Sequence, residues 1–77
     1  MRKNLRKCRL NKKLSVEDIS QVLNISKSYY YKIESGLRNP TMILAKQMAN
    51  LLEEDIEFLF FNNNLDKMSN KDSYISL

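Results

Sequence analysis

The fold is decided by residues 15–40, which read SVEDISQVLNISKSYYYKIESGLRNP. Ser15 followed three residues later by Asp18 is typical of a capping box, with Asp in place of the usual Glu, and the helix dipole favours acids in a first turn. The helix that begins directly after Ser15 is predicted to end at Asn24, which tolerates the left-handed conformation of a tight turn. Its apolar positions are Val16, Ile19, Val22 and Leu23.

A second helix is predicted directly beyond this turn, over residues 27–35. Ser26 has the side chain of an N-cap, and Gly36 lies where a helix commonly ends in a left-handed residue. Because residues advance by about 100° along a helix, this one has two opposed faces. The inner face is expected to join a core that contains Ile19, Leu23, Ile25, Tyr30 and Ile33. The opposite face carries Lys27, Ser28, Tyr31 and Lys32.

Further helices are predicted on both sides of this pair. Leu5 and Cys8 lie three positions apart among cations, which predicts a short amphipathic helix over residues 3–12. Thr41 can cap another helix that extends through Leu52. The core-facing stripe of that helix is expected to be Met42, Ala45, Met48, Ala49 and Leu52.

The end of the chain divides into a short helix and a tail. A helix is predicted over residues 55–60, with Ile56, Leu59 and Phe60 pointing inward. Residues 62–77 are rich in Asn, Ser, Asp and Lys, and they are expected to form a polar tail that is mobile or ordered only by a partner. The predicted architecture is therefore all-α, a compact four- to five-helix bundle over residues 1–61 followed by this tail.

The composition excludes several classes of protein. A chain of 77 residues forms one small domain, and one Gly and one Pro leave little turn chemistry for an all-β fold. A single Cys and the absence of His exclude an internal disulfide, a zinc finger and a His-based catalytic site. That cysteine, Cys8, is expected in the core, and a reactive thiol beside the cations is the alternative.

Location and ligands follow from the same composition. The charged N-terminal segment lacks the apolar stretch of a signal peptide, and no stretch approaches the roughly 18 apolar residues of a membrane span. We therefore expect a cytoplasmic protein with no membrane partner, no metal, no cofactor and no small-molecule ligand.

The charge is distributed unevenly. Residues 1–46 contain eleven Lys and Arg against three acids, whereas residues 47–77 contain two Lys against six acids. Seven cations precede the first acid: Arg2, Lys3, Arg6, Lys7, Arg9, Lys12 and Lys13. Such a run attracts polyanions, and the alternative is a solvated helix face that keeps the protein soluble.

The two helices joined through Leu23-Asn-Ile-Ser26, together with the segment Ile33-Glu-Ser-Gly-Leu-Arg-Asn-Pro40, resemble the Cro/C1-type helix-turn-helix family, also called the Xre family. The resemblance covers roughly residues 5–60 and implies a lambda-repressor-like bundle whose helix 27–35 enters the major groove of double-stranded DNA. Members often have Gln, Ala and Gly where this sequence has Val16, Ser20 and Asn24. Without that Gln, only backbone N–H groups are left to bind phosphate at the start of the preceding helix.

Base readout is assigned to one helix face, made of Lys27, Ser28, Tyr31 and Lys32. A lysine can donate to guanine O6 or N7, and a serine hydroxyl can bond to several bases. Tyr29 flanks this face beside the DNA backbone. For Tyr29 and Tyr31 the alternative is packing against neighbouring helices.

Contacts to the DNA backbone are assigned to Ser15, Val16, Tyr29, Arg38, Asn39 and Thr41. The resemblance implies that the family holds the backbone at Arg38 and Asn39 and at the following helix N-terminus, and a free surface cation is the alternative for Arg38. Arg9 and Glu34 occupy positions that in several relatives form a partly buried ion pair. This pair is therefore assigned to architecture.

The leading hypothesis for function is a sequence-specific double-stranded DNA-binding regulator, of the phage or mobile-element repressor type. A homodimer on a palindromic operator is expected, because two modules about one helical turn apart give a useful specificity. Phe58 and Phe61 are candidates for the shared surface, or they close the monomer core.

Two other function classes were weighed against the regulator. An antitoxin or adaptor that uses the same fold to hold another protein is the alternative. An enzyme is not expected, because without His the Ser, Lys and carboxylate side chains form no recognisable catalytic order.

Overall fold

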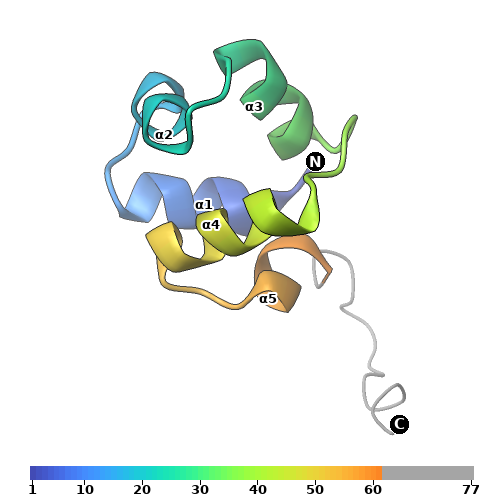
Figure 1. Cartoon of the computed structure of the whole chain (residues 1–77). Coiled ribbons are helices and arrows are strands. Elements are labelled where there is room, and N and C mark those ends of the chain that lie inside the picture. The colour runs from blue at the N-terminus through green and yellow to red at the C-terminus, as the bar shows by residue number, and fades with distance from the viewer. Residues whose placement is uncertain (62–77) are drawn as a thin grey trace, which may run out of the picture.

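The computed structural model describes residues 1–61, and these form helices alone. In chain order the helices are α1 (Lys3–Asn11), α2 (Val16–Leu23), α3 (Lys27–Ser35), α4 (Met42–Leu52) and α5 (Ile56–Phe60). Helices α1 and α4 cross the middle of the molecule, with α2 and α3 on one side and α5 on the other (Figure 1). The all-α prediction is confirmed. The predicted tail over residues 62–77 lies outside the described residues.

Helix α2 begins and ends as its sequence dictates. The Ser15 hydroxyl accepts a hydrogen bond from the Asp18 N–H at 2.9 Å, and the Asp18 carboxylate accepts one from the Ser15 N–H at 3.0 Å. The bond from the Ser15 N–H, and to a lesser extent the Ser15 hydroxyl, lowers the pKa of the Asp18 carboxyl, because hydrogen bonds to a carboxylate favour its charged form. Asn24 ends the helix in the left-handed region, at φ 60°. The turn to α3 is therefore set by local chemistry at both ends of α2.

Helices α3 and α4 are capped in the same way. The Ser26 hydroxyl accepts from the Tyr29 N–H at 3.0 Å, and the Thr41 hydroxyl accepts from the Leu44 N–H at 3.1 Å. A side-chain cap of this kind stabilises a helix by about 1 kcal/mol. Gly36 ends α3 at φ 93°, where a residue with a Cβ would be strained.

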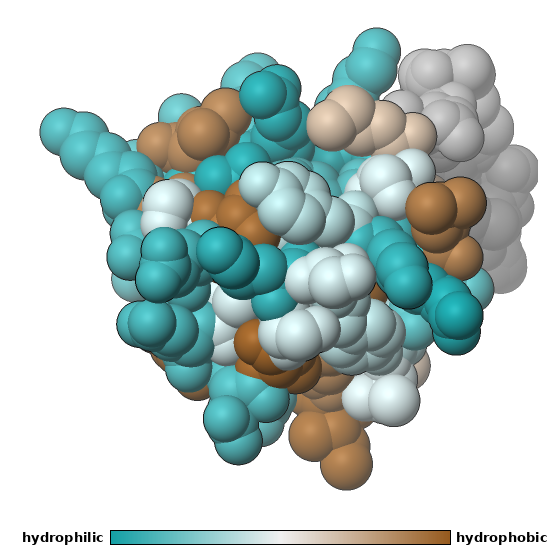
Figure 2. All heavy atoms as spheres, turned by 90° about the horizontal axis from the view of Figure 1, so that it is seen from above, coloured by the Kyte–Doolittle hydropathy of each residue, from teal (hydrophilic) through white to brown (hydrophobic). Residues whose placement is uncertain are grey.

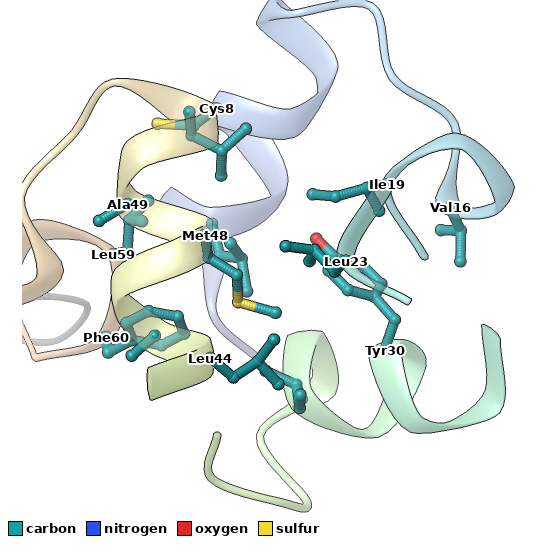
Figure 3. Packing of buried hydrophobic residues seen from close by; sticks show 14 residues of the cluster. Cys8, Val16, Ile19, Leu23, Tyr30, Leu44, Met48, Ala49, Leu59 and Phe60 are labelled. Atoms are coloured by element: carbon teal, nitrogen blue, oxygen red, sulfur yellow. The ribbon is translucent and has the colours of Figure 1, made fainter. Parts of the chain in front are cut away.

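The core lies inside the bundle and draws on every helix (Figure 3). Its most deeply buried apolar side chains are Leu5, Ile19, Tyr30, Ile33, Met48 and Leu59. Tyr30 and Ile33 fix the inner face of α3 as predicted, and Ile25 is partly buried against the core cluster. Cys8 is also buried, as expected. Burial of α3 along one side leaves its other side free to meet a partner.

Met42, which was predicted to face the core, does not, and neither does Val22, which is one of the apolar positions of its helix. Val22 is 62% exposed and Met42 is 59% exposed. On α2 the buried positions Val16, Ile19 and Leu23 centre on a face that includes Ser20, and Val22 lies about 110° from that centre. Met42 is the first residue of α4, and because helical side chains tilt towards the N-terminus it extends past the end of the helix. Leu44 is buried on α4 although the predicted stripe omitted it.

Candidate nucleic-acid interface

The outer face of α3 holds the four residues predicted for base readout. Lys27, Ser28, Tyr31 and Lys32 are all exposed, and Tyr31 is 57% exposed. On the opposite face Tyr30 and Ile33 have no exposed surface. Figure 2 looks down on the side formed by α2 and α3, where pale side chains of intermediate hydropathy lie among hydrophilic ones. Such a surface, polar with interspersed aromatic rings, suits a base-lined groove.

Tyr29 lies between these two faces. It is half-buried and packs against the core cluster, and its N–H is held by the Ser26 cap. Part of the Tyr29 ring is therefore used in packing against the core. The Tyr31 ring is exposed and is not packed in this way.

The start of α2 offers backbone N–H groups and little else. The Ser15 hydroxyl and N–H are both engaged in the capping box, and the Val16 side chain is buried. First-turn N–H groups of a helix have no partner within the helix, and the helix dipole makes them attractive to anions. The exposed carboxylate of Glu17 lies at the same end and opposes an incoming phosphate.

A groove of about 580 Å³ connects this helix end to α3. Arg6 and Lys27 contribute cations to its lining, and Glu17 contributes an anion. The groove also reaches Tyr31 on the outer face of α3. The start of α2, the middle of α1 and the exposed side of α3 therefore border one continuous surface.

Beneath this groove Arg9 and Glu34 form a buried ion pair. Arg9 Nε lies 3.2 Å from Glu34 Oε2, and Arg9 Nη2 lies 3.4 Å from Glu34 Oε1. Arg9 Nη1 also donates to the Leu14 carbonyl at 2.9 Å, and the Tyr30 hydroxyl donates to Glu34 Oε2 at 3.3 Å. Burial and the charge of Glu34 raise the pKa of Tyr30, so its hydroxyl stays protonated as a donor. This network holds three parts of the chain together: α1, α3 and the segment that precedes α2.

Burial by itself lowers the pKa of Arg9, but its hydrogen bond and charge contact with Glu34 outweigh that effect and raise the pKa. Arg9 therefore stays charged. With these directional contacts in place, the pair holds the orientation of α3 relative to α1.

The loop between α3 and α4 presents the remaining predicted backbone contacts. Arg38, Asn39 and Thr41 are exposed, and the Arg38 side chain has no partner among residues 1–61. The Arg38 N–H donates to the Lys32 carbonyl at 3.1 Å, which ties the loop to the last turn of α3. The Thr41 hydroxyl is used as the α4 cap. Within residues 1–61 Arg38 is thus a cation without a partner, in a loop that a backbone hydrogen bond ties to α3.

Arg2 is the residue of this region that sequence reasoning missed. Its guanidinium Nη1 donates to the carbonyls of Ile33 and, at 3.1 Å, of Arg38. Its Nη2 donates to Asn39 Oδ1 at 2.6 Å. Arg2 precedes α1, so helical periodicity gave no signal for its contacts, and it was counted only as one cation of the basic run.

The two candidates for a dimer surface differ in exposure. Phe58 is half-buried against the core, and its carbonyl accepts from Asn4 Nδ2 at 3.0 Å. Phe61 is 65% exposed. Leu37 and Ile43 are further large apolar side chains with more than two thirds of their surface exposed.

Within residues 1–61, none of the helices combines the length and the apolar run that crossing a bilayer requires. In the same part of the chain, no three or more Asp, Glu, Cys or His side chains are grouped so as to hold a metal ion.

Comparison with known proteins identifies the family. Residues 5–59 match the model of the Cro/C1-type Helix-turn-helix family. The chain is 37% identical over 75 residues to a Bacillus subtilis protein named Uncharacterized HTH-type transcriptional regulator YqaF, over 95% of this chain and 97% of that protein. It is 29% identical over 65 residues to Uncharacterized HTH-type transcriptional regulator YqaE of the same organism, over 84% of this chain and 56% of that protein. No solved structure matches the chain significantly. The chain belongs to the Cro/C1-type helix-turn-helix family of DNA-binding transcriptional regulators.

Proposed function

We propose that this protein is a sequence-specific repressor that inserts α3 into the major groove of its operator. One observation carries the proposal. Helix α3 is anchored along one side by Tyr30, Ile33 and the Arg9–Glu34 pair, and it exposes polar and aromatic side chains along the other. An α-helix held in this way fits the width of the major groove.

The outer face of α3 has the chemistry to distinguish bases. Lys27 and Lys32 are point donors suited to guanine O6 and N7, and Ser28 both donates and accepts. The Tyr31 ring can contact a thymine methyl group while its hydroxyl bonds to a base edge or a phosphate. We assign base readout to these four residues.

Backbone contacts fix the register of α3 in the groove. The start of α2 borders the same groove as Tyr31, and the loop that carries Arg38 and leads to Thr41 is tied to the last turn of α3. We also assign backbone contacts to Tyr29 and Asn39. Contacts of this kind hold a recognition helix without carrying sequence information.

A homodimer on a palindromic operator completes the proposal. One module reaches only a few base pairs, whereas two modules about one helical turn apart recognise a longer site. The exposure of Phe61 supports its place in the shared surface, and half-buried Phe58 serves mainly the monomer core.

The test is selection of bound sequences from a randomised duplex pool, followed by Lys32→Ala. A palindromic consensus is the expected result, because it records both half-sites and their spacing. Lys32→Ala should then weaken binding to the selected site by about 1–3 kcal/mol and weaken binding to random duplex much less. Lys46→Ala, which removes an exposed cation from α4, is the matched control and should change both affinities little.

An equal loss on both duplexes would reassign Lys32 to the DNA backbone. A selection without any consensus, or binding whose affinity does not change between low and moderate salt, would exclude the repressor and favour an adaptor that holds another protein. The exposed apolar side chains of Leu37, Ile43 and Phe61 are the observation that favours this second candidate.

A further inference from the structure

The segment before α1 supplies hydrogen-bond donors to the C-terminal end of α3. The Arg2 N–H donates to the Glu34 carbonyl at 2.8 Å, and the Arg2 guanidinium donates to the Ile33 carbonyl. The last carbonyls of a helix have no partner within the helix, and a cation at this end is favoured by the helix dipole. Arg2 therefore supplies both a backbone and a side-chain donor to the C-terminal turn of α3.

The same guanidinium holds the loop beyond α3. Its Nη1 donates to the Arg38 carbonyl at 3.1 Å, and its Nη2 donates to Asn39 Oδ1 at 2.6 Å. Three of the five guanidinium donors thus bind protein oxygens that come from two different elements. Arg2 bridges the end of α3 to the loop that carries Arg38.

Arg2 is held without a carboxylate. Within residues 1–61, no Asp or Glu oxygen lies within 4.0 Å of its side-chain nitrogens, and the charge instead lies 5.5 Å from the centre of the Phe60 ring. Partial burial lowers the pKa of Arg2, because desolvation disfavours its charged form. Within residues 1–61 the acceptors of this cation are carbonyl and amide oxygens, and the planar guanidinium fits their arrangement.

We infer that Arg2 is a positioning residue for DNA binding, which fixes the Arg38 loop against the end of α3 so that both meet the same stretch of duplex. The inference rests on the proposed function. Because the hydrogen-bonded donors are turned towards protein oxygens, Arg2 acts through Arg38 and α3. It is not itself a phosphate contact.

The experiment compares Arg2→Ala, Arg2→Lys and Lys3→Ala in the full chain. Lys3 is exposed and adjacent, so Lys3→Ala removes the same charge without removing the bridge. Affinity for the selected site and for random duplex is measured over a range of salt, with thermal unfolding recorded for each variant. Arg2→Ala should weaken binding to the selected site by about tenfold, because a hydrogen-bonded charged group is lost, while the slope of log K against log salt stays that of the parent protein.

Arg2→Lys should recover little of this loss, because an ammonium cannot bond to three separated acceptors in one plane. A fall in the salt slope of about 0.9 for Arg2→Ala but not for Arg2→Lys would overturn the inference and make Arg2 a phosphate contact. A loss no larger than that of Lys3→Ala, or one explained entirely by the unfolded fraction, would overturn it as well.

A second measurement does not require DNA. Amide hydrogen exchange in the free protein should accelerate at Arg38 and Gly36 in Arg2→Ala, and the rate at Asn24, in the turn after α2, should stay unchanged. Unchanged exchange at Arg38 would refute the bridge whether or not the protein binds DNA. Accelerated exchange in a protein that binds no duplex would leave the bridge intact and refute the proposed function.

Discussion

The two halves of this molecule are held together by different forces. All the buried polar and charged residues in the described chain, Arg9, Ser20 and Glu34, belong to α1, α2 and α3. The buried residues of α4 and α5 are apolar, and they include Leu44, Met48, Leu52, Leu59 and Phe60. Apolar packing is non-directional and tolerates adjustment, whereas hydrogen-bonded charges fix angles. The half that presents the outer face of α3 is thus the half with directional contacts.

The largest expected effect comes from breaking the polar half. Arg9→Ala should destabilise the fold by about 3–5 kcal/mol, because it leaves the Glu34 carboxylate buried without its partner. In the apolar half Met48→Leu, which conserves volume, should cost less than about 1.5 kcal/mol. Urea unfolding measures both, and a loss below about 1 kcal/mol for Arg9→Ala would show that the two halves do not differ in this way.

A smaller effect of opposite sign is expected at Ser20. Its hydroxyl is buried and has no hydrogen-bond partner among residues 1–61. Ser20→Ala should therefore stabilise the fold by about 1 kcal/mol, because an unsatisfied polar atom leaves the core. Ser28→Ala on the exposed face of α3 is the control and should change the unfolding free energy little. A clear loss of stability in Ser20→Ala would mean that water satisfies the hydroxyl.

The two halves also differ in charge, and a pair of carboxylates makes the difference measurable. Glu17 borders the groove beside Arg6 and Lys27, whereas Glu54 lies in the turn between α4 and α5, away from α3 (Figure 1). Glu17→Gln should strengthen binding to the selected duplex by about two- to fivefold, and Glu54→Gln should change it less, because charges beyond about 8–10 Å are screened. Equal effects in a filter-binding or fluorescence titration would mean that only net charge matters.

The smallest expected effect concerns the melting temperature at acid pH. The depressed pKa of Asp18 means that its carboxylate stabilises the fold above its ordinary value of 3.8, and that this contribution is lost as the pH falls through the lower folded value. The difference in melting temperature between the parent protein and Asp18→Asn should therefore shrink as the pH falls below about 4. Asp55→Asn is the control, because Asp55 makes no side-chain cap. A constant difference for Asp18→Asn would assign its effect to something other than the capping box.

Sequence reasoning was strongest where structure is set locally. Ser15, Ser26 and Thr41 marked the helix starts, and Asn24 and Gly36 marked two ends, because caps and left-handed residues depend on a few neighbouring atoms. Helical geometry also separated the inner face of α3 from its outer face. The five-helix order was therefore predictable from the chain alone.

The failures have two causes. Spacing alone placed Met42 in a core-facing stripe, although it is the first residue of α4 and extends past the end of the helix. The contacts of Arg2 join residues more than thirty positions apart, and no local pattern encodes them. Local rules therefore set the elements of the candidate interface, and packing set which side chains hold it in place.

The fixed orientation of α3 relative to α1 has a consequence for its operator. With its inner side locked to α1 through Arg9, Glu34 and Tyr30, the helix has little freedom to adapt to a mismatched groove. On the proposed function, the duplex is then the partner that bends or twists to bring two half-sites onto two stiff protomers. We expect base pairs between the half-sites to influence affinity through their flexibility, although no side chain touches them.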